Sequence, residues 1–247
     1  MIRLASMSKL ENWLIKKYQV LDSTQEEAKR LIDSGEARQG YVLLAEEQTK
    51  AHGKLDKLWE GSKSDIALTM ILKPEIEADR LGQICYIAAL AVAKSIKSLS
   101  PSLNVEFKWV NDVLINGQKV CGILLEKVKH DFVLVGIGVN LKYSAHLAKY
   151  NATSLEAYKV AYDYDALVED ILKNFIDIYN MWLDAGFSPV KNKWLSQAKG
   201  INSTLNVNLA DKSIEGIFIG IEDEGNLLLV TGGGIKSIPA GDVFFKI

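Results

Sequence analysis

The chain has 247 residues, of which 48% are hydrophobic and 24% are charged, and its formal net charge is −2. These values are typical of an ordinary globular protein with one large domain, or with a domain and a small module. So small a net charge argues against a surface that coats nucleic acid. The longest uncharged run, residues 81–93, is too short to cross a bilayer, and the N-terminus has no signal-peptide pattern. We therefore expect neither a nucleic-acid nor a membrane partner.

Cys85 and Cys121 are the two cysteines of the chain, and they form neither a metal-ligand spacing nor a disulfide framework. This usage is typical of the reducing cytosol, so the sequence predicts a cytoplasmic protein. It predicts no metal site built from protein ligands.

The N-terminal part predicts a strand at residues 14–20 and a helix that begins after Ser23. Ser23 and Glu26 have the spacing of a capping box, and Gly35 ends the helix. Capping alone would explain Ser23, although the free N–H groups of a helix start also suit a polar ligand. A buried strand at 41–46 then leads into a long polar loop at 47–63, and a loop of this length is usually functional or disordered.

Further strands are predicted at residues 66–72 and 105–109, on either side of an apolar helix at 79–99. Residues 132–139 predict another strand, which ends in Gly136-Ile137-Gly138-Val139-Asn140. No GxGxxG opens a helix there, so a Rossmann dinucleotide site is disfavoured. Residues 143–161 look like a loop, and an amphipathic helix at 163–183 and a shorter one to about 198 follow.

Asn116-Gly117 lies between two apolar runs, and this dipeptide favours a two-residue hairpin turn because both turn residues need positive φ. Side chains alternate between faces along a strand, so the charged Asp112 and Lys119 share one face, which Lys108 joins unless residues 110–111 bulge. Unpaired charge buried there would cost several kcal/mol, so the face is either solvated or binds a ligand. The predicted pairs are Asp112–Cys121, Leu114–Lys119 and Ile115–Gln118, with Cys121 on the charged face.

The same block resembles the central signature of biotin–protein ligases. The matching residues are Lys108-Trp109-x-Asn111-Asp112 and Lys119-Val120-x-Gly122-Ile123-Leu124-x-Glu126. Val110 departs from the proline that the family usually has. The motifs occur in the same order as in the family, and the resemblance extends over nearly the whole chain. It implies the family's α+β fold, in which helices pack on a mixed β-sheet and a small SH3-like β-barrel follows.

The short strands predicted at residues 213–221, 226–230 and 234–238 fit that barrel. We therefore expect a catalytic domain at 1–199 and a C-terminal domain at 200–247. About twenty residues precede the first motif, too few for the helix-turn-helix domain of the family members that also act as repressors. The resemblance thus implies a monofunctional ligase with no DNA-binding role.

The resemblance implies a two-step reaction. Biotin's carboxylate attacks the α-phosphate of ATP, which gives biotinyl-5′-AMP and pyrophosphate, and a lysine of a biotin carboxyl carrier protein or domain then attacks the mixed anhydride. The first step brings two anions together, so the site must supply positive charge, with Mg²⁺ neutralising the phosphates.

The resemblance also assigns site residues, with Lys119 as the bridge between carboxylate and phosphate. The catalytic set is Lys54, Lys108, Asp112 and Lys119. The biotin-binding set is Ser23, Thr24, Gln25, Gln48, His52, Gly53, Lys54, Lys119 and Gly122. The nucleotide-binding set is Lys54, Trp59, Asn111, Lys119, Gly138 and Asn140. Trp59 and Trp109 either wall the pocket or belong to the core.

The loop at residues 51–57 is the largest departure from the family, which normally has Gly-Arg-Gly-Arg-x-Gly-Arg there. This chain reads Ala51-His52-Gly53-Lys54-Leu55-Asp56-Lys57. Lysine can neutralise a phosphate but cannot make arginine's two-pronged contact. The loop is therefore either a working but altered lid or a mobile surface loop. Gln25, where the family has asparagine, is a milder departure.

Two other functions fit the sequence. Lipoate ligases and octanoyltransferases share the fold and some use a cysteine nucleophile, but no activating base is visible near Cys121. A degenerate homologue would bind biotin or its adenylate without transferring it. A homodimer is left open.

Overall fold

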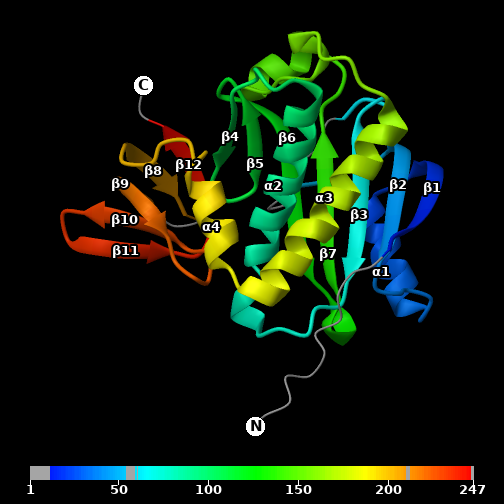
Figure 1. Cartoon of the computed structure of the whole chain (residues 1–247), viewed down its shortest axis with the longest axis horizontal. Coiled ribbons are helices and arrows are strands. Elements are labelled where there is room, and N and C mark those ends of the chain that lie inside the picture. Colours follow the sequence, from blue (N-terminus) through cyan, green and yellow to red (C-terminus); the bar gives the residue numbers. More distant parts are fainter. Residues whose placement is uncertain (1–11, 54–58, 60, 210–211, 246–247) are drawn as a thin grey trace.

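The computed structural model describes residues 12–53, 59, 61–209 and 212–245. Figure 1 shows a large sheet covered by helices and, beside it, a smaller sheet formed by the last part of the chain. Within the described residues, no helix is both long and apolar enough to cross a membrane.

The large sheet has seven strands in the order β1-β2-β3-β7-β6-β5-β4. β1 and β2 are parallel and the other neighbours are antiparallel, so the sheet is mixed, as predicted. Its strands are β1 (Leu14–Leu21), β2 (Tyr41–Gln48), β3 (Ile66–Leu72), β4 (Val105–Lys108), β5 (Asp112–Ile115), β6 (Gln118–Lys127) and β7 (Val133–Val139).

Helices α2 (Gln83–Leu99) and α3 (Tyr164–Ala185) cover one face of this sheet (Figure 1). Helix α1 (Thr24–Asp33) packs on the opposite face, where Ala28 and Leu31 meet Leu43 and Leu134. Alternation along β7 explains both contacts, because its valines and Ile137 enter the main core while Leu134 points to α1. Since α1 covers only one end of its face, the rest is available for a site.

The predicted helix boundaries are close to those observed, with two differences. The helix expected from residue 79 begins at Gln83, because Ala78–Arg80 form a 3₁₀ turn that ends before the N-cap Gly82. Ser23 caps α1, but its Oγ accepts from the Gln25 N–H at 3.2 Å and the Glu26 carboxylate binds Lys29. The reciprocal capping box is therefore not formed.

The small sheet has five antiparallel strands in the order β11-β10-β9-β8-β12. This arrangement is consistent with an SH3-like domain, although no pairing between described residues joins β11 to β12 and closes a barrel. β8 and β12 were not predicted. The strands are β8 (Thr204–Asn208), β9 (Ser213–Ile221), β10 (Leu227–Thr231), β11 (Gly234–Ile238) and β12 (Asp242–Phe245).

Buried hydrogen bonds fix the small sheet to the large unit. The Gly225 carbonyl, in the turn between β9 and β10, accepts from the Tyr86 hydroxyl and from the Trp109 indole N–H. Helix α4 (Ser188–Leu195) leads into this sheet, and Ala198 pairs with Phe107 of β4. Trp109 thus belongs to the core.

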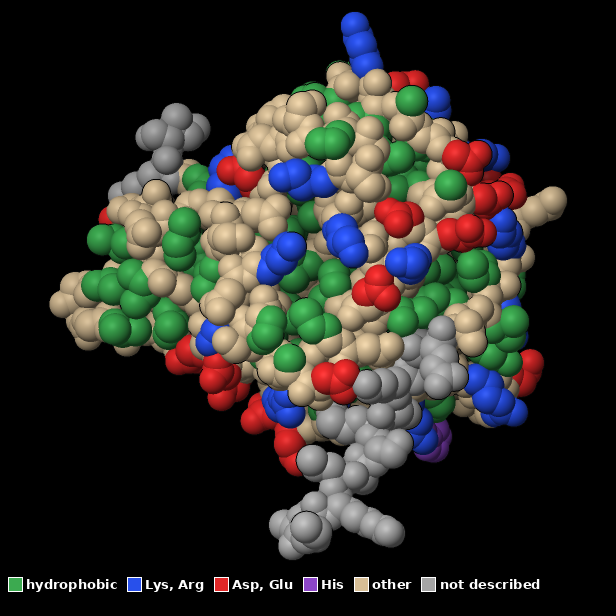
Figure 2. Space-filling view, in the orientation of Figure 1, with side chains coloured by type: hydrophobic (Ala, Val, Ile, Leu, Met, Phe, Trp, Pro, Cys, Tyr) green, Lys and Arg blue, Asp and Glu red, His purple; other side chains and the backbone are tan. Residues whose placement is uncertain are grey.

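The outer face of the small sheet carries exposed hydrophobic side chains, which Figure 2 shows gathered over β9, β10 and β11. Ile217, Val230 and Ile235 are exposed and pair with one another across these three strands. The inner face of β9 and β10 is buried, as the alternation of side chains requires.

Candidate active site

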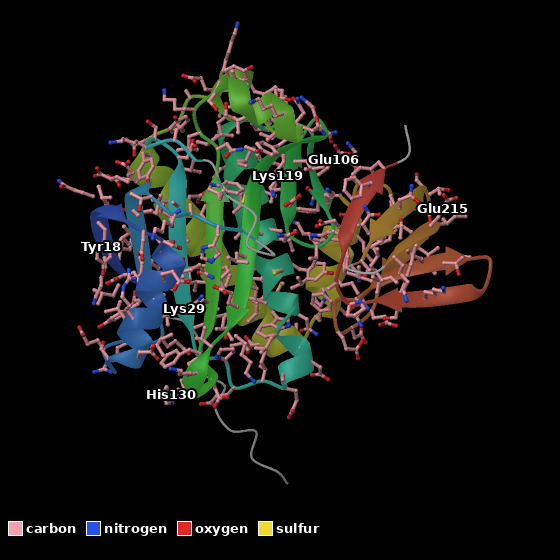
Figure 3. All side chains as sticks on the ribbon, turned by 180° about the vertical axis from the view of Figure 1, so that it is seen from behind. Tyr18, Lys29, Glu106, Lys119, His130 and Glu215 are labelled. Atoms are coloured by element: carbon pink, nitrogen blue, oxygen red, sulfur yellow. The ribbon has the colours of Figure 1, made fainter. Side chains whose placement is uncertain are left out.

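A cavity of about 600 Å³ lies on the sheet face that α1 leaves uncovered. Figure 3 looks onto this face from behind, with Lys29 on α1 toward one end and Lys119 toward the other. Residues of the small sheet complete the wall beyond Lys119, since Asp242 and Phe244 of β12 also line the cavity. The cavity therefore runs from the start of α1 to the junction of the two sheets.

Strand register builds the cavity floor from small side chains. One row crosses five strands and consists of Ala67, Gly138, Gly122, Asp112 and Lys108. A Cβ on either glycine would lie 2.7–2.8 Å from the Trp59 indole, so only glycine allows a flat group to rest on the backbone there. The row ends in charged residues, which places a carboxylate and an ammonium group beside the flat floor.

The hairpin register differs from the prediction at one point. Ile115–Gln118 and Leu114–Lys119 pair as predicted, but a register shift between Val113 and Leu114 pairs Asp112 with Gly122 and Val113 with Cys121. The predicted Asp112–Cys121 pair is therefore wrong. Cys121 lies in the core and is fully buried, and Gly122 shares the cavity face with Lys119. An irregularity of this kind re-aims the side chains that follow it.

The charged residues of the hairpin meet at the cavity. Lys119 Nζ lies 2.6 Å from Asp112 Oδ1 and 5.4 Å from the centre of the Trp59 ring. Asp112 Oδ1 is buried, and this ion pair is its contact among the described residues. Lys108 Nζ lies 5.5 Å from the Phe244 ring centre. An ammonium group held by one carboxylate can exchange it for a new anion of the ligand.

The opposite end of the cavity is lined by neutral polar groups. Gln48 Oε1 accepts from the Thr24 N–H at 2.8 Å and lies 3.1 Å from Thr24 Oγ1. Gln25 Nε2 donates to Glu126 at 2.8 Å. Ser23, Thr24 and Gln25 are almost fully buried. This end can therefore recognise a neutral polar group by directional hydrogen bonds.

Two family matches cover most of the chain. Residues 18–141 match the biotin/lipoate A/B protein ligase family, and residues 200–246 match the biotin protein ligase C-terminal domain. The chain belongs to the biotin/lipoate A/B protein ligase family.

Similar proteins agree with this assignment. The chain is 34% identical to a biotin--[acetyl-CoA-carboxylase] ligase of Paracoccus denitrificans, over 91% of this chain and 97% of that protein. It is 33% identical to the bifunctional ligase/repressor BirA of Bacillus subtilis, over 92% and 72% of the respective lengths. A solved structure of the biotin protein ligase from Aquifex aeolicus with biotin and ATP matches with a TM-score of 0.83 at 26% identity, covering 95% of this chain and 98% of that chain. The predicted resemblance to biotin–protein ligases and the α+β fold are confirmed.

Most of the residues predicted from the ligase signature lie in the one cavity. Lys54 falls outside the described residues, as do Leu55, Asp56 and Lys57. The Asn111 and Asn140 side chains also donate to the carbonyls of Ile123 and Thr153, at 2.9 and 3.0 Å. The predicted residues that line the cavity are Ser23, Thr24, Gln25, Gln48, His52, Gly53, Trp59, Lys108, Asn111, Asp112, Lys119, Gly122, Gly138 and Asn140.

Sequence reasoning missed two parts of the ligase cavity. The segment expected to be a loop forms a 3₁₀ helix at Ala145–Tyr150, after which Ala152 pairs with Lys119. Leu147, Tyr150 and Ala152 thereby line the cavity. The other part is β12, with Asp242 and Phe244. Apolar residues within a polar loop were a weak signal for the first part, whereas the second depends on how the two sheets dock.

The structure argues against a nucleophilic cysteine in this ligase fold. Full burial raises the pKa of the Cys121 thiol, and a nucleophile must be a thiolate in contact with substrate. Among the described residues, no group of three or more histidine, cysteine or acidic side chains could hold a metal ion.

Proposed function

We propose that this chain activates biotin with ATP and transfers it to a lysine of a carrier protein. The observation that carries the proposal is one continuous cavity with neutral hydrogen-bonding groups at one end and the ammonium groups of Lys119 and Lys108 at the other. Membership of the ligase family and the likeness to a ligase that binds biotin and ATP support it.

In this proposal Thr24 and Gln48, with Ser23, hold the ureido ring of biotin. The biotin carboxylate then lies near Lys119 and attacks the α-phosphorus of ATP, and the bond to the β-phosphate breaks, releasing pyrophosphate. The Lys119 ammonium leaves Asp112 to neutralise the carboxylate and the α-phosphate as they approach. Positive charge placed against the reacting oxygens stabilises the negative charge of such a step.

The second step needs a neutral amine from the carrier. Its nitrogen attacks the carbonyl carbon of biotinyl-5′-AMP, the bond to AMP breaks, and the amine loses a proton. Asp112, released from Lys119, is placed to orient this amine by accepting a hydrogen bond.

The nucleotide is proposed to lie against the Trp59 indole, which itself rests on Gly122 and Gly138, with Asn111 and Asn140 beside it. Lys108 faces the phosphates from β4, beside Phe244. Mg²⁺ would enter bound to the ATP phosphates and neutralise their charge, and Asp112 is one carboxylate that could share it. One or two carboxylates suffice for an ion held mainly by phosphates, so the residues present fit it.

Other parts of the proposal rest on sequence. His52 and Gly53 line the cavity at the start of the divergent loop, and Lys54 takes the place of the family's arginine, as a point charge without a two-pronged contact. We place the domain boundary at residues 199/200, supported by the family match that begins at residue 200. The carrier is proposed to belong to a biotin-dependent carboxylase, and cytoplasmic location and a homodimer also remain proposals.

The test mixes the protein with biotin, Mg-ATP and a biotin carboxyl carrier domain. Pyrophosphate and covalently biotinylated carrier should both appear, and both should depend on biotin. Pyrophosphate without labelled carrier would identify a protein that stops at the adenylate. Neither product, with biotin still bound, would identify a passive binder and refute the proposed function.

A further inference from the structure

Five polar side chains form a continuous chain from the surface of α1 to the biotin end of the cavity. The successive contacts are Glu126 Oε2 to Gln25 Nε2 at 2.8 Å, Gln25 Oε1 to Thr69 Oγ1 at 2.8 Å, Thr69 Oγ1 to Thr24 Oγ1 at 2.8 Å, and Thr24 Oγ1 to Gln48 Oε1 at 3.1 Å. We refer to these residues as the Glu126–Gln48 chain. Thr69 is completely buried and, like Glu126, is not among the cavity-lining residues.

Glu126 sets the direction of this chain. Its carboxylate is paired with Lys29 at 3.2 Å, and an ionised carboxylate can only accept hydrogen bonds. The Gln25 amide must therefore turn its NH₂ group to Glu126 and its oxygen to Thr69. Amide orientation is otherwise ambiguous, and here the charged neighbour removes the ambiguity.

The remaining contacts join pairs of oxygen atoms, and there are fewer hydroxyl hydrogens than contacts. Three oxygen–oxygen contacts follow from Gln25 to Gln48, but only the hydroxyls of Thr69 and Thr24 supply hydrogens. Gln25 Oε1 faces the Thr69 hydroxyl, whereas Gln48 Oε1 already accepts from the Thr24 N–H at 2.8 Å. The Thr69 hydroxyl donates to Gln25 Oε1. The Thr24 hydroxyl hydrogen is used within the same group of residues, on Gln48 Oε1 at 3.1 Å or on Thr69 Oγ1 at 2.8 Å.

We infer that Glu126, Gln25 and Thr69 are positioning residues. They fix which hydrogen-bonding atoms of Thr24 and Gln48 face the substrate. Thr24 Oγ1, whose hydrogen is used on Gln48 or on Thr69, offers the cavity only lone pairs. Gln48, with its oxygen held by the Thr24 N–H, offers its NH₂ group. An acceptor beside a donor is complementary to the N–H and C=O of a cyclic urea, and an acyl chain without these groups would leave both unpaired.

This inference rests on the proposed function, since it takes the α1 end of the cavity as the ureido site. It changes the role predicted for Gln25, because both ends of its amide are used by the protein. Gln25 then acts through Thr69.

The test replaces Thr69 by valine, which keeps the branched shape in β3 and removes the hydroxyl. The dissociation constant of biotin alone, measured by calorimetry, should rise about tenfold, because Thr24 loses the hydrogen bond with the Thr69 hydroxyl that orients it. The KM for ATP should stay within twofold of wild type. Thr69→Ser restores the hydroxyl and should bind biotin within threefold of wild type.

A second pair of variants removes one Lys29 carboxylate partner each. Glu126→Gln lets the Gln25 amide turn either way and should weaken biotin binding about threefold or more. Glu26→Gln is the matched control, because Glu26 also binds Lys29, at 2.7 Å, but does not belong to the Glu126–Gln48 chain. It should leave biotin binding unchanged. If Thr69→Val does not fold, the biotin affinity of Glu126→Gln tests the inference: unchanged affinity in this variant would overturn it.

Unchanged biotin affinity in a folded Thr69→Val variant would overturn the inference while leaving the proposed function intact. Equal losses of biotin and ATP affinity would also overturn it, since they indicate a merely structural role. A wild-type protein that binds no biotin would overturn both the inference and the proposed function.

Discussion

The two ends of the cavity are built on different physical principles. At the α1 end, Thr24, Gln25 and Thr69 are buried and their polar atoms are held by neighbouring side chains. At the other end, Lys119 is partly exposed and is held by an ion pair with Asp112. One end is rigid before any ligand arrives, whereas the other can rearrange.

This difference matches what each end is proposed to do. A neutral ring is recognised by hydrogen bonds of fixed direction, and such recognition depends on groups that do not reorient. A reacting carboxylate and phosphate change charge and position during the reaction, so a lysine that exchanges partners can follow them. Variants at the α1 end should therefore affect biotin binding, whereas variants at the other end should affect the use of ATP and the reaction rate.

Lys119→Ala is expected to have the largest effect. Loss of the bridging charge should lower the rate of biotin-dependent pyrophosphate release about 100- to 1,000-fold, with little change in biotin affinity. Pyrophosphate release and biotin calorimetry check this, and a thermal melt verifies that the variant folds. Unchanged pyrophosphate release would refute the role of Lys119.

Two glycines of β7 sharpen the comparison, because they lie on the same face two residues apart. A methyl group on Gly138 would meet the Trp59 indole at 2.7 Å, whereas one on Gly136 would meet Gln25 Oε1 at 3.2 Å. Gly138→Ala should raise the KM for ATP about tenfold and Gly136→Ala the KM for biotin by a similar factor, each with little effect on the other substrate. The same loss for both substrates in both variants would argue against two separate ends.

Phe244→Ala tests the contribution of the small sheet to the phosphate end. The Phe244 ring faces the Lys108 ammonium, and a cation–π contact at an exposed site is worth about 0.5–1 kcal/mol. The KM for ATP should therefore rise about two- to fivefold, as steady-state kinetics can measure. Phe244→Tyr keeps the ring and serves as the control. An unchanged KM for ATP in Phe244→Ala would show that Phe244 of β12 does not contribute to ATP binding.

Cys121→Ala should have the smallest effect on activity. Cys121 is buried on the helix side of the sheet, and burial raises the pKa of its thiol, so no thiolate is presented to the cavity. Biotinylation of the carrier should stay within twofold of wild type, with a modest loss of thermal stability from the cavity left behind. Loss of carrier biotinylation in a folded variant would contradict this prediction and support acyl transfer through Cys121.

The elements of the fold were largely predictable because hydrophobic periodicity determines them. β3 was predicted at its observed bounds, and α1 and α3 within a few residues. The Asn116-Gly117 turn gave the right register next to it because turn geometry is local. Gly138, which the resemblance assigned to the nucleotide, does line the cavity.

The parts that were not predictable depend on contacts between distant segments. The shift at Val113/Leu114 moved Cys121 into the core, and the Asn116-Gly117 turn contains no signal for it. Residues of β12 reach the cavity only because the Gly225 turn docks on Tyr86 and Trp109. The Glu126–Gln48 chain joins four elements, so no local pattern indicates it.

The central claim is that Lys119 stands where biotin and nucleotide are joined. A crystal structure with biotinyl-5′-AMP bound tests it most directly. We predict the Lys119 ammonium within about 3.2 Å of the oxygens of the acyl-phosphate linkage, with its contact to Asp112 lengthened and the ureido ring at Thr24 and Gln48. A Lys119 side chain that points to solvent, or an adenylate bound elsewhere, would contradict the claim.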